Sequence, residues 1–153
     1  MRGRGIFVDA NLLVLLAVGL TDRRLIEKHK RLKQFSADDY DRLIEIISQV
    51  KRVFVMPNTL TEASNLLAQH REPQRSRFLR TLRNVIEQGE EVVVASAEAS
   101  RNADFERLGL TDAALLETVS GETPLLTTDF DLYRAAARRN PQSAFNYWHR
   151  WNA

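Results

Sequence analysis

The sequence predicts an α/β fold in which a parallel sheet of about five strands is flanked by helices on both faces. Short apolar, β-branched runs typical of buried strands alternate along the chain with longer segments of helical periodicity. With 153 residues, 44% of them hydrophobic, the chain is long enough to bury one core. No internal repeat, low-complexity tract or linker interrupts it, so we expect a single domain over residues 1–153.

The first half of the chain shows a strand–helix alternation with one clear capping signal. Ser36 is followed three residues later by Asp39, a typical helix start, and apolar residues then recur at helical spacing. In order, the predicted elements are a strand at 6–8, a helix from Leu12, a charged helix at 21–34, a helix after Ser36, a strand at 53–57 and helices at 59–70 and 73–87.

The second half continues the same alternation. Thr111 is the expected N-cap of a helix that precedes the fourth strand, because threonine favours this position. The remaining predicted elements are a strand at 91–96, helices at 98–108 and after Thr111, a strand at 124–128, a helix at 132–138 and an edge strand at 144–148.

Composition excludes several classes of site. The chain has no cysteine, which rules out disulfides, thiolate metal sites and cysteine nucleophiles. The basic start and apolar stretch at the N-terminus resemble a signal peptide, but Asp9 and Asn11 interrupt the apolar run, which is also too short to cross a bilayer. We therefore expect a cytoplasmic protein that does not interact with membranes.

Acidic residues lie where the predicted strands end and helices begin. Asp9 directly follows the first strand, and Glu62 is expected in the first turn of the helix after the second strand. Asp129 follows the fourth strand, with Asp131 two residues on, and Asp112 opens the helix before that strand. Because ligands bind at the carboxyl ends of parallel strands, we expect several of these acids to converge on one edge of the sheet.

Each of these acids also has a purely structural explanation. Asp9 and Asp129 could cap the helices that follow them. Thr59 and Glu62 fit a capping box, and the helix dipole favours an anion at Asp112. The joint pattern favours a functional site, because carboxylates gathered in one pocket repel one another unless a cation offsets their charge.

An oxygen-rich site of this kind suits Mg²⁺ or Mn²⁺, since the chain has no cysteine and none of its three histidines lies near these acids in the sequence. Asn11, Thr127 and Thr128 are the expected hydrogen-bonding groups that hold the carboxylates in place. A metal bound there would activate water and stabilise charge on a phosphate, which predicts phosphodiester hydrolysis.

Four segments of the chain together resemble the motifs of PIN-domain ribonucleases, which include the VapC-type toxins of bacterial and archaeal toxin–antitoxin pairs. The segments are "FVDANLLVLL", "MPNTLTEASNLL", "LGLTDAALLE" and "LLTTDFDL", in that order along the chain. Their acids are Asp9, Glu62, Asp112 and Asp129, with Asp131 as a further acid in the fourth segment.

The resemblance implies a five-stranded parallel fold and endonucleolytic cleavage of RNA. It assigns Asp9, Glu62, Asp112 and Asp129 as metal-binding catalytic acids for Mg²⁺ or Mn²⁺, with Asp131 as an auxiliary ligand. It also implies a small antitoxin partner and a homodimer. One departure is Ala10, which stands where the family often has threonine or serine after the first acid.

A long basic segment separates the first acid from the second strand. We expect it, together with the start of the helix at 73–87, either to clamp RNA or to form a solvated helix pair. The candidate RNA-binding residues are Arg23, Arg24, Lys28, Arg75, Arg77 and Arg80.

Two other functions compete with a metal-dependent ribonuclease. A phosphatase of the haloacid-dehalogenase type would also use an aspartate after the first strand, but it needs a second acid two residues later, where this chain has Asn11. A non-catalytic module that binds RNA or protein would keep the fold without the chemistry, yet all four acids are present.

Overall fold

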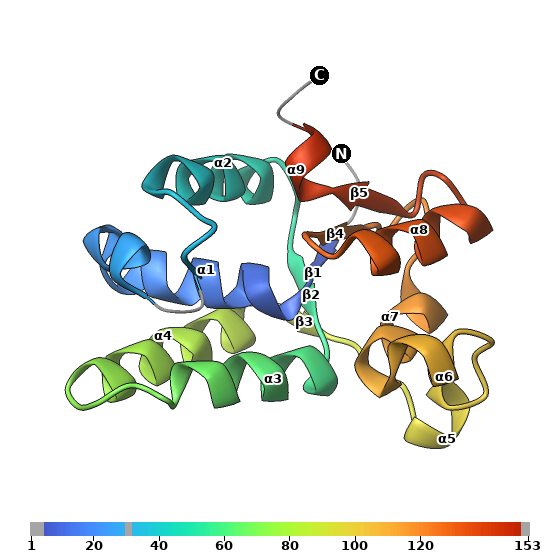
Figure 1. The fold of residues 1–153 in the computed structure, drawn as a ribbon, viewed down its shortest axis with the longest axis horizontal. Helices are drawn as coiled ribbons and strands as arrows, with labels where there is room; N and C mark the ends of the chain where they lie inside the picture. Colours follow the sequence, from blue (N-terminus) through green and yellow to red (C-terminus); the bar gives the residue numbers. More distant parts are fainter. Residues whose placement is uncertain (1–4, 30–31, 151–153) are drawn as a thin grey trace.

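The computed structural model of the protein describes residues 5–29 and 32–150. These residues form an α/β fold with a five-stranded, all-parallel sheet in the order β3-β2-β1-β4-β5, which confirms the predicted fold class (Figure 1). The strands are β1 (Ile6–Val8), β2 (Val53–Val55), β3 (Glu90–Glu91), β4 (Leu125–Thr127) and β5 (Ala144–Asn146).

Helices cover both faces of the sheet. Over one face lie α1 (Ala10–Thr21), the 3-10 helix η1 (Arg23–Lys28), α2 (Ala37–Ser48), α3 (Pro57–Leu67) and α4 (Gln74–Gln88). On the opposite side lie α5 (Ser96–Ala99), α6 (Phe105–Leu108), α7 (Leu110–Thr118) and α8 (Phe130–Arg139), while α9 (Tyr147–Arg150) follows β5.

The strands divide the core into two hydrophobic clusters, because successive side chains of a strand point to opposite faces. In β1, Ile6 and Val8 belong to the cluster beneath α1, and Phe7 belongs to the cluster beneath α7 and α8. The Phe7 ring stacks on Phe54 of β2 with 5.2 Å between centroids. The apolar runs of the sequence are therefore strands buried on both faces, as a parallel sheet requires.

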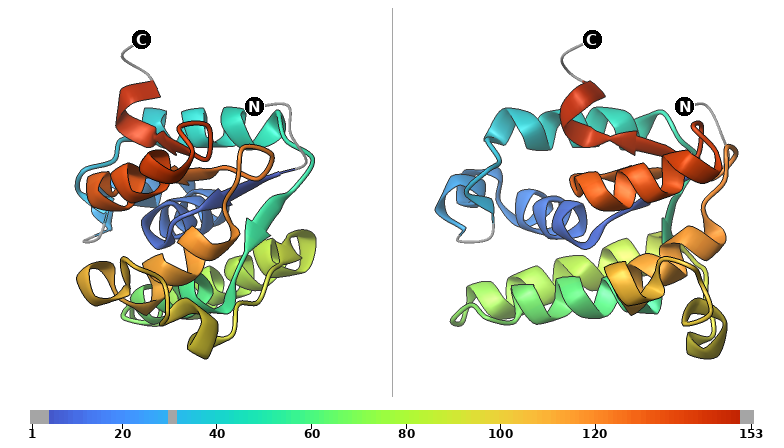
Figure 2. Two further views of the ribbon diagram at one scale, coloured as in Figure 1. Left: turned by 90° about the vertical axis from the view of Figure 1, so that its right-hand side faces the viewer. Right: turned by 45° about the vertical axis from the view of Figure 1, so that its right-hand side comes forward.

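Helix α1 is the centre of the first layer. It contacts α2 on one side and the antiparallel pair α3 and α4 on the other (Figures 1 and 2). Every residue from Leu12 to Gly19 is buried, which explains why apolar residues occur all round this helix. Among the described residues, no helix combines the length and apolarity needed to span a membrane.

Every predicted strand after the first is shorter in the structure. Those predicted at 53–57 and 124–128 span only Val53–Val55 and Leu125–Thr127. The expected strand at 91–96 pairs only through Glu90–Glu91 and the Val92 amide, which donates to the Val55 carbonyl over 2.8 Å. Beyond that point the chain leaves the sheet edge, and Val93 is 70% exposed. The preference of β-branched residues for strands depends on packing against a neighbouring surface, which Val93 lacks here. At 144–148 the strand ends at Asn146, whose side chain accepts the Trp148 amide and turns the chain into α9.

The helix predicted over residues 98–108 is interrupted. Its place is taken by α5 and α6, which are separated by the buried Asn102. The Asn102 side chain accepts the Asp104 amide and donates to Glu117 over 2.7 Å, and such local bonds compete with helical ones. The charged segment 21–34 is also only partly helical: η1 occupies Arg23–Lys28, and residues 30–31 lie outside the described part of the chain.

Two helix starts differ from prediction in ways that affect the acids. Helix α3 begins at Pro57, so Thr59 is inside it and donates to the Met56 carbonyl, and no Thr59–Glu62 capping box forms. Helix α7 begins at Leu110 after Gly109, whose φ of 89° favours glycine, so Thr111 is not the N-cap. The predicted capping box at Ser36 is confirmed.

Candidate active site

Four acids from different segments line one small pocket of about 110 Å³. Two of them are the N-caps of α1 and α8, one lies in the first turn of α7 and one in the middle of α3. The acids are Asp9, Glu62, Asp112 and Asp129. The structure thus brings together the four acids singled out in the sequence, including Asp112, which lies far from any strand end in the chain.

Asp9 is the most firmly held of the four. Its carboxylate is buried, and Oδ1 accepts the Leu12 amide over 2.9 Å, so Asp9 does cap α1. Oδ2 accepts the Thr127 hydroxyl at 2.6 Å and both the amide and hydroxyl of Thr128 at 2.8 and 3.2 Å. Burial raises the pKa of Asp9, and these hydrogen bonds oppose that rise. Oδ1, with one donor, keeps acceptor capacity for a further partner.

Thr127 links two of the acids. Its buried hydroxyl donates to Asp9 Oδ2 and accepts the Asp129 amide over 2.9 Å, so one hydroxyl fixes both the first acid and the backbone of the last. Two of the three residues expected to hold the carboxylates, Thr127 and Thr128, therefore contact Asp9. The third, Asn11, lines the pocket, but among the described residues its side chain holds none of the four acids.

Substituting Thr127 by Val is expected to destabilise the protein by about 1–3 kcal/mol, because two buried polar partners lose their hydrogen bonds while the side-chain volume stays the same. Chemical denaturation measures this change. Thr127→Ser, which keeps the hydroxyl, is the matched control and should retain most of the stability. Unchanged stability of Thr127→Val beside a loss in Thr127→Ser would show that the methyl group, and not the hydroxyl, matters at this position.

The pKa of Asp112 reflects its burial and the concentration of negative charge in the pocket. Its pKa is raised from 3.8 to about 7, first by burial and then by the charges of Asp129, Glu62 and Asp9. The other three acids therefore lie near enough to Asp112 to disfavour its ionisation. Without a cation to offset their charge, ionisation of all four carboxylates at neutral pH is unfavourable.

Glu62 and Asp129 differ in their local bonding. Asp129 caps α8, because its Oδ1 accepts the amides of Asp131 and Leu132 over 2.9 and 3.1 Å. Glu62 lies in the second turn of α3 rather than the first, and its exposed side chain takes no part in a cap. The capping explanation thus applies to Asp9 and Asp129 but is wrong for Glu62.

The donor set of the pocket fits a hard divalent cation. Its charged donors are four carboxylates, and no histidine or cysteine contributes to its lining. Within residues 5–29 and 32–150, no three acidic or histidine side chains are arranged to hold one ion as they stand. A cation would therefore have to draw the carboxylates inward, and it would relieve the repulsion that raises the pKa of Asp112.

Asp131 does not belong to this cluster. It is exposed, follows Asp129 in the first turn of α8 and does not line the pocket. Ala10, in contrast, lines the pocket beside Asp9. The lining also contains Thr59 and Thr111, for which the sequence predicts only helix capping.

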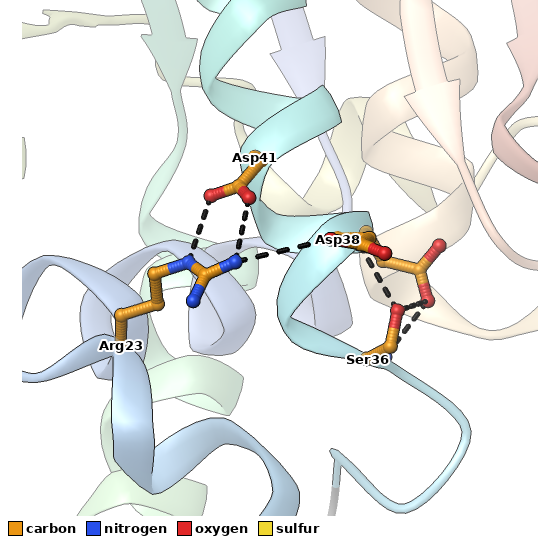
Figure 3. A network of polar contacts seen from close by, with 5 residues as sticks. Arg23, Ser36, Asp38 and Asp41 are labelled. Carbon is orange, nitrogen blue, oxygen red and sulfur yellow. Dashed lines mark hydrogen bonds and ion pairs between the residues drawn. The ribbon is translucent and has the colours of Figure 1, made fainter.

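Two of the candidate RNA-binding arginines form ion pairs within the protein, and a third, Arg75, donates to the Ala68 carbonyl over 3.2 Å. Arg23 forms a two-pronged ion pair with Asp41 of α2, at 3.0 and 2.7 Å, and lies 3.8 Å from Asp38 (Figure 3). Arg24 pairs with Asp22 through both side-chain oxygens. These pairs lower the pKa of Asp41 and of Asp22, and they join η1 to its neighbours.

The basic residues also lie far from the acid pocket. Helix α1, with 12 residues, begins at Asp9 and ends beside η1, and a helix of that length rises about 18 Å. The remaining candidates, Lys28, Arg75, Arg77 and Arg80, lie in η1 or in the first half of α4, toward the same distant end (Figure 1). These residues are therefore remote from the acid pocket.

The site combines one carboxylate held by four hydrogen bonds, that of Asp9, with three that have fewer hydrogen bonds. The hydroxyl groups of Thr127 and Thr128 fix Asp9, and the raised pKa of Asp112 reflects the density of negative charge. No protein-family model matches this chain, and neither does any curated protein sequence.

Proposed function

We propose that this protein is an endoribonuclease that hydrolyses RNA phosphodiester bonds with the aid of Mg²⁺ or Mn²⁺. The observation that supports this function best is the convergence of four carboxylates, from four separate helices, on one pocket at the carboxyl edge of the sheet. Structural caps alone do not account for this convergence, since Glu62 caps no helix and the four charges raise the free energy of the cluster.

The chain's own residues would perform two tasks in this reaction. Asp9, Glu62, Asp112 and Asp129 would hold the cation, which when bound supplies an activated water and offsets charge on the phosphate. Thr127 and Thr128 would keep Asp9 oriented. In the net reaction the water oxygen joins phosphorus, the bond from phosphorus to the leaving ribose oxygen breaks, and a proton passes to that oxygen.

The choice of RNA as substrate has two supports. Lysine and arginine total 22 against 20 acidic residues, so a surface whose acids are partly gathered in one pocket is more basic than the net charge of +2 indicates. The order of the four acidic motifs is that of PIN-domain ribonucleases. The proposed role as the toxin of a toxin–antitoxin pair, with a small antitoxin partner and a homodimeric state, rests on this resemblance alone.

Incubation with end-labelled RNA tests the proposal. We expect single-stranded or looped RNA to be cut in the presence of Mg²⁺ or Mn²⁺, to stay intact in EDTA, and to be cut again when excess Mn²⁺ is restored. Attack by water leaves phosphate monoester ends, whereas a metal-independent nuclease that uses the ribose 2′-hydroxyl leaves cyclic phosphates. Cleavage that persists in EDTA, or RNA binding without cleavage in either metal, would contradict the proposed activity.

A further inference from the structure

A large aromatic side chain is exposed next in sequence to one of the pocket acids. Phe130 directly follows Asp129, which lines the pocket, and it is the first residue of α8. Its side chain is 51% exposed, although the same helix buries Leu132, Ala135 and Ala136. Phe130 therefore does not belong to the buried core, and about half of its side chain is apolar surface exposed beside Asp129.

A cation lies over this ring, and the Tyr133 ring lies tilted to it with 6.4 Å between the centroids. The guanidinium carbon of Arg134, one helical turn further along α8, is 5.7 Å from the centre of the Phe130 ring. Within the described part of the chain, no acidic side chain forms an ion pair with Arg134. Its positive charge is thus available to a ligand, in contrast to the charges of Arg23 and Arg24, which carboxylates of the protein already offset.

This pair of groups matches the two parts of a nucleotide. An exposed aromatic ring offers a stacking surface to any nucleobase, and a guanidinium group binds a phosphate. The carboxylates of Asp129 and Asp131 flank Phe130 in the sequence and repel phosphate, so the uncharged base is the part that suits the ring. The phosphate suits Arg134, which lies one turn further along α8 than its acidic first residues.

We propose that Phe130 and Arg134 form a subsite for one nucleotide of single-stranded RNA, with the base stacked on Phe130 and a phosphate paired with Arg134. This subsite rests on the proposed ribonuclease function, because it would hold the strand next to the acid pocket. A base inside a duplex is already stacked on both faces, so the subsite selects unpaired nucleotides.

Binding measurements on an inactive background test the subsite. In Asp112→Asn protein with Mg²⁺ present, Phe130→Ala is expected to weaken binding of a short single-stranded RNA by roughly 5- to 100-fold, and Phe130→Tyr to preserve it. Arg134→Gln should weaken binding and reduce its salt dependence. The matched controls are Leu20→Ala, which truncates a residue that is also 51% exposed but lies at the far end of α1, and Arg138→Gln, one turn beyond Arg134.

An abasic nucleotide identifies the stacking contact directly. If the base stacks on Phe130, one abasic position in the RNA should weaken binding to the parent protein and remove the difference between it and Phe130→Ala. Equal affinities of Phe130→Ala and Leu20→Ala, or equal binding of duplex and single-stranded RNA, would overturn the subsite. If Phe130→Ala cleaves RNA with an unchanged KM, the subsite is overturned but the ribonuclease function is not. If the unsubstituted protein neither binds nor cleaves RNA, both the subsite and the ribonuclease function are overturned.

Discussion

Substitution of Asp112 by Asn is expected to reduce metal-dependent RNA cleavage by at least about 100-fold, because a bound cation contributes several kcal/mol of transition-state stabilisation. Asn keeps the shape of the side chain but removes one negative charge from the cluster. Asp112 is the best single position for this test, since its carboxylate makes no hydrogen bond to any of the described residues and its ionisation is unfavourable in the folded protein. Rates at saturating RNA in Mg²⁺ and in Mn²⁺ measure the loss.

The other acids extend this prediction into a series with an internal control. Glu62→Gln and Asp129→Asn should lose activity to a similar degree, because both side chains line the same pocket. Asp131→Asn should retain it, because Asp131 lies two residues from Asp129 but outside the pocket. Asp9→Asn should be inactive and also less stable, since its new amide would face the donors of Thr127 and Thr128. Full activity in Asp112→Asn, or equal losses in Asp131→Asn, would refute this assignment of roles.

The sheet was predictable from the sequence because its signal is local. Runs such as Ile6–Val8 and Leu125–Thr127 are apolar at consecutive positions, and that pattern is typical of strands buried on both faces. The predicted elements were wrong where contacts with distant parts of the chain determine the secondary structure. Of the three valines after Glu91, Val92 and Val94 pack against the core while Val93 is exposed, so the strand does not continue. Asn102 broke a helix by bonding to Glu117, 15 residues away.

The site was predictable to the extent that topology determines it. Asp9 and Asp129 follow strands β1 and β4, which are neighbours in the sheet, so their proximity follows from strand order. Asp112 follows no strand, and only the packing of α7 against α3 and α8 brings it to the pocket. The exposure of Phe130 was not predictable for a different reason. It depends on which elements pack around α8, and a periodic pattern of apolar residues does not identify them.

In metal-free solution, Asp112→Asn is expected to stabilise the protein at pH 8 while leaving its stability at pH 4 nearly unchanged. Below the ordinary pKa of 3.8, Asp112 is protonated in both the folded and the unfolded chain, so its ionisation costs nothing. As the pH rises toward about 7, the unfolded chain loses this proton and the folded chain keeps it, and stability falls. Above about pH 7 both states are ionised, and the full cost remains.

The expected gain at pH 8 is about 1–2 kcal/mol, because solvent screens this half-exposed carboxyl, whereas a fully buried group with the same shift would give roughly 4 kcal/mol. Urea denaturation in EDTA at several pH values measures the difference between the two proteins. Mg²⁺ or Mn²⁺ should stabilise the unsubstituted protein at pH 8 more than Asp112→Asn, because a cation in the pocket offsets the repulsion that the substitution has already reduced. A difference in stability that is constant from pH 4 to pH 8 would show that Asp112 acts through packing and not through its charge.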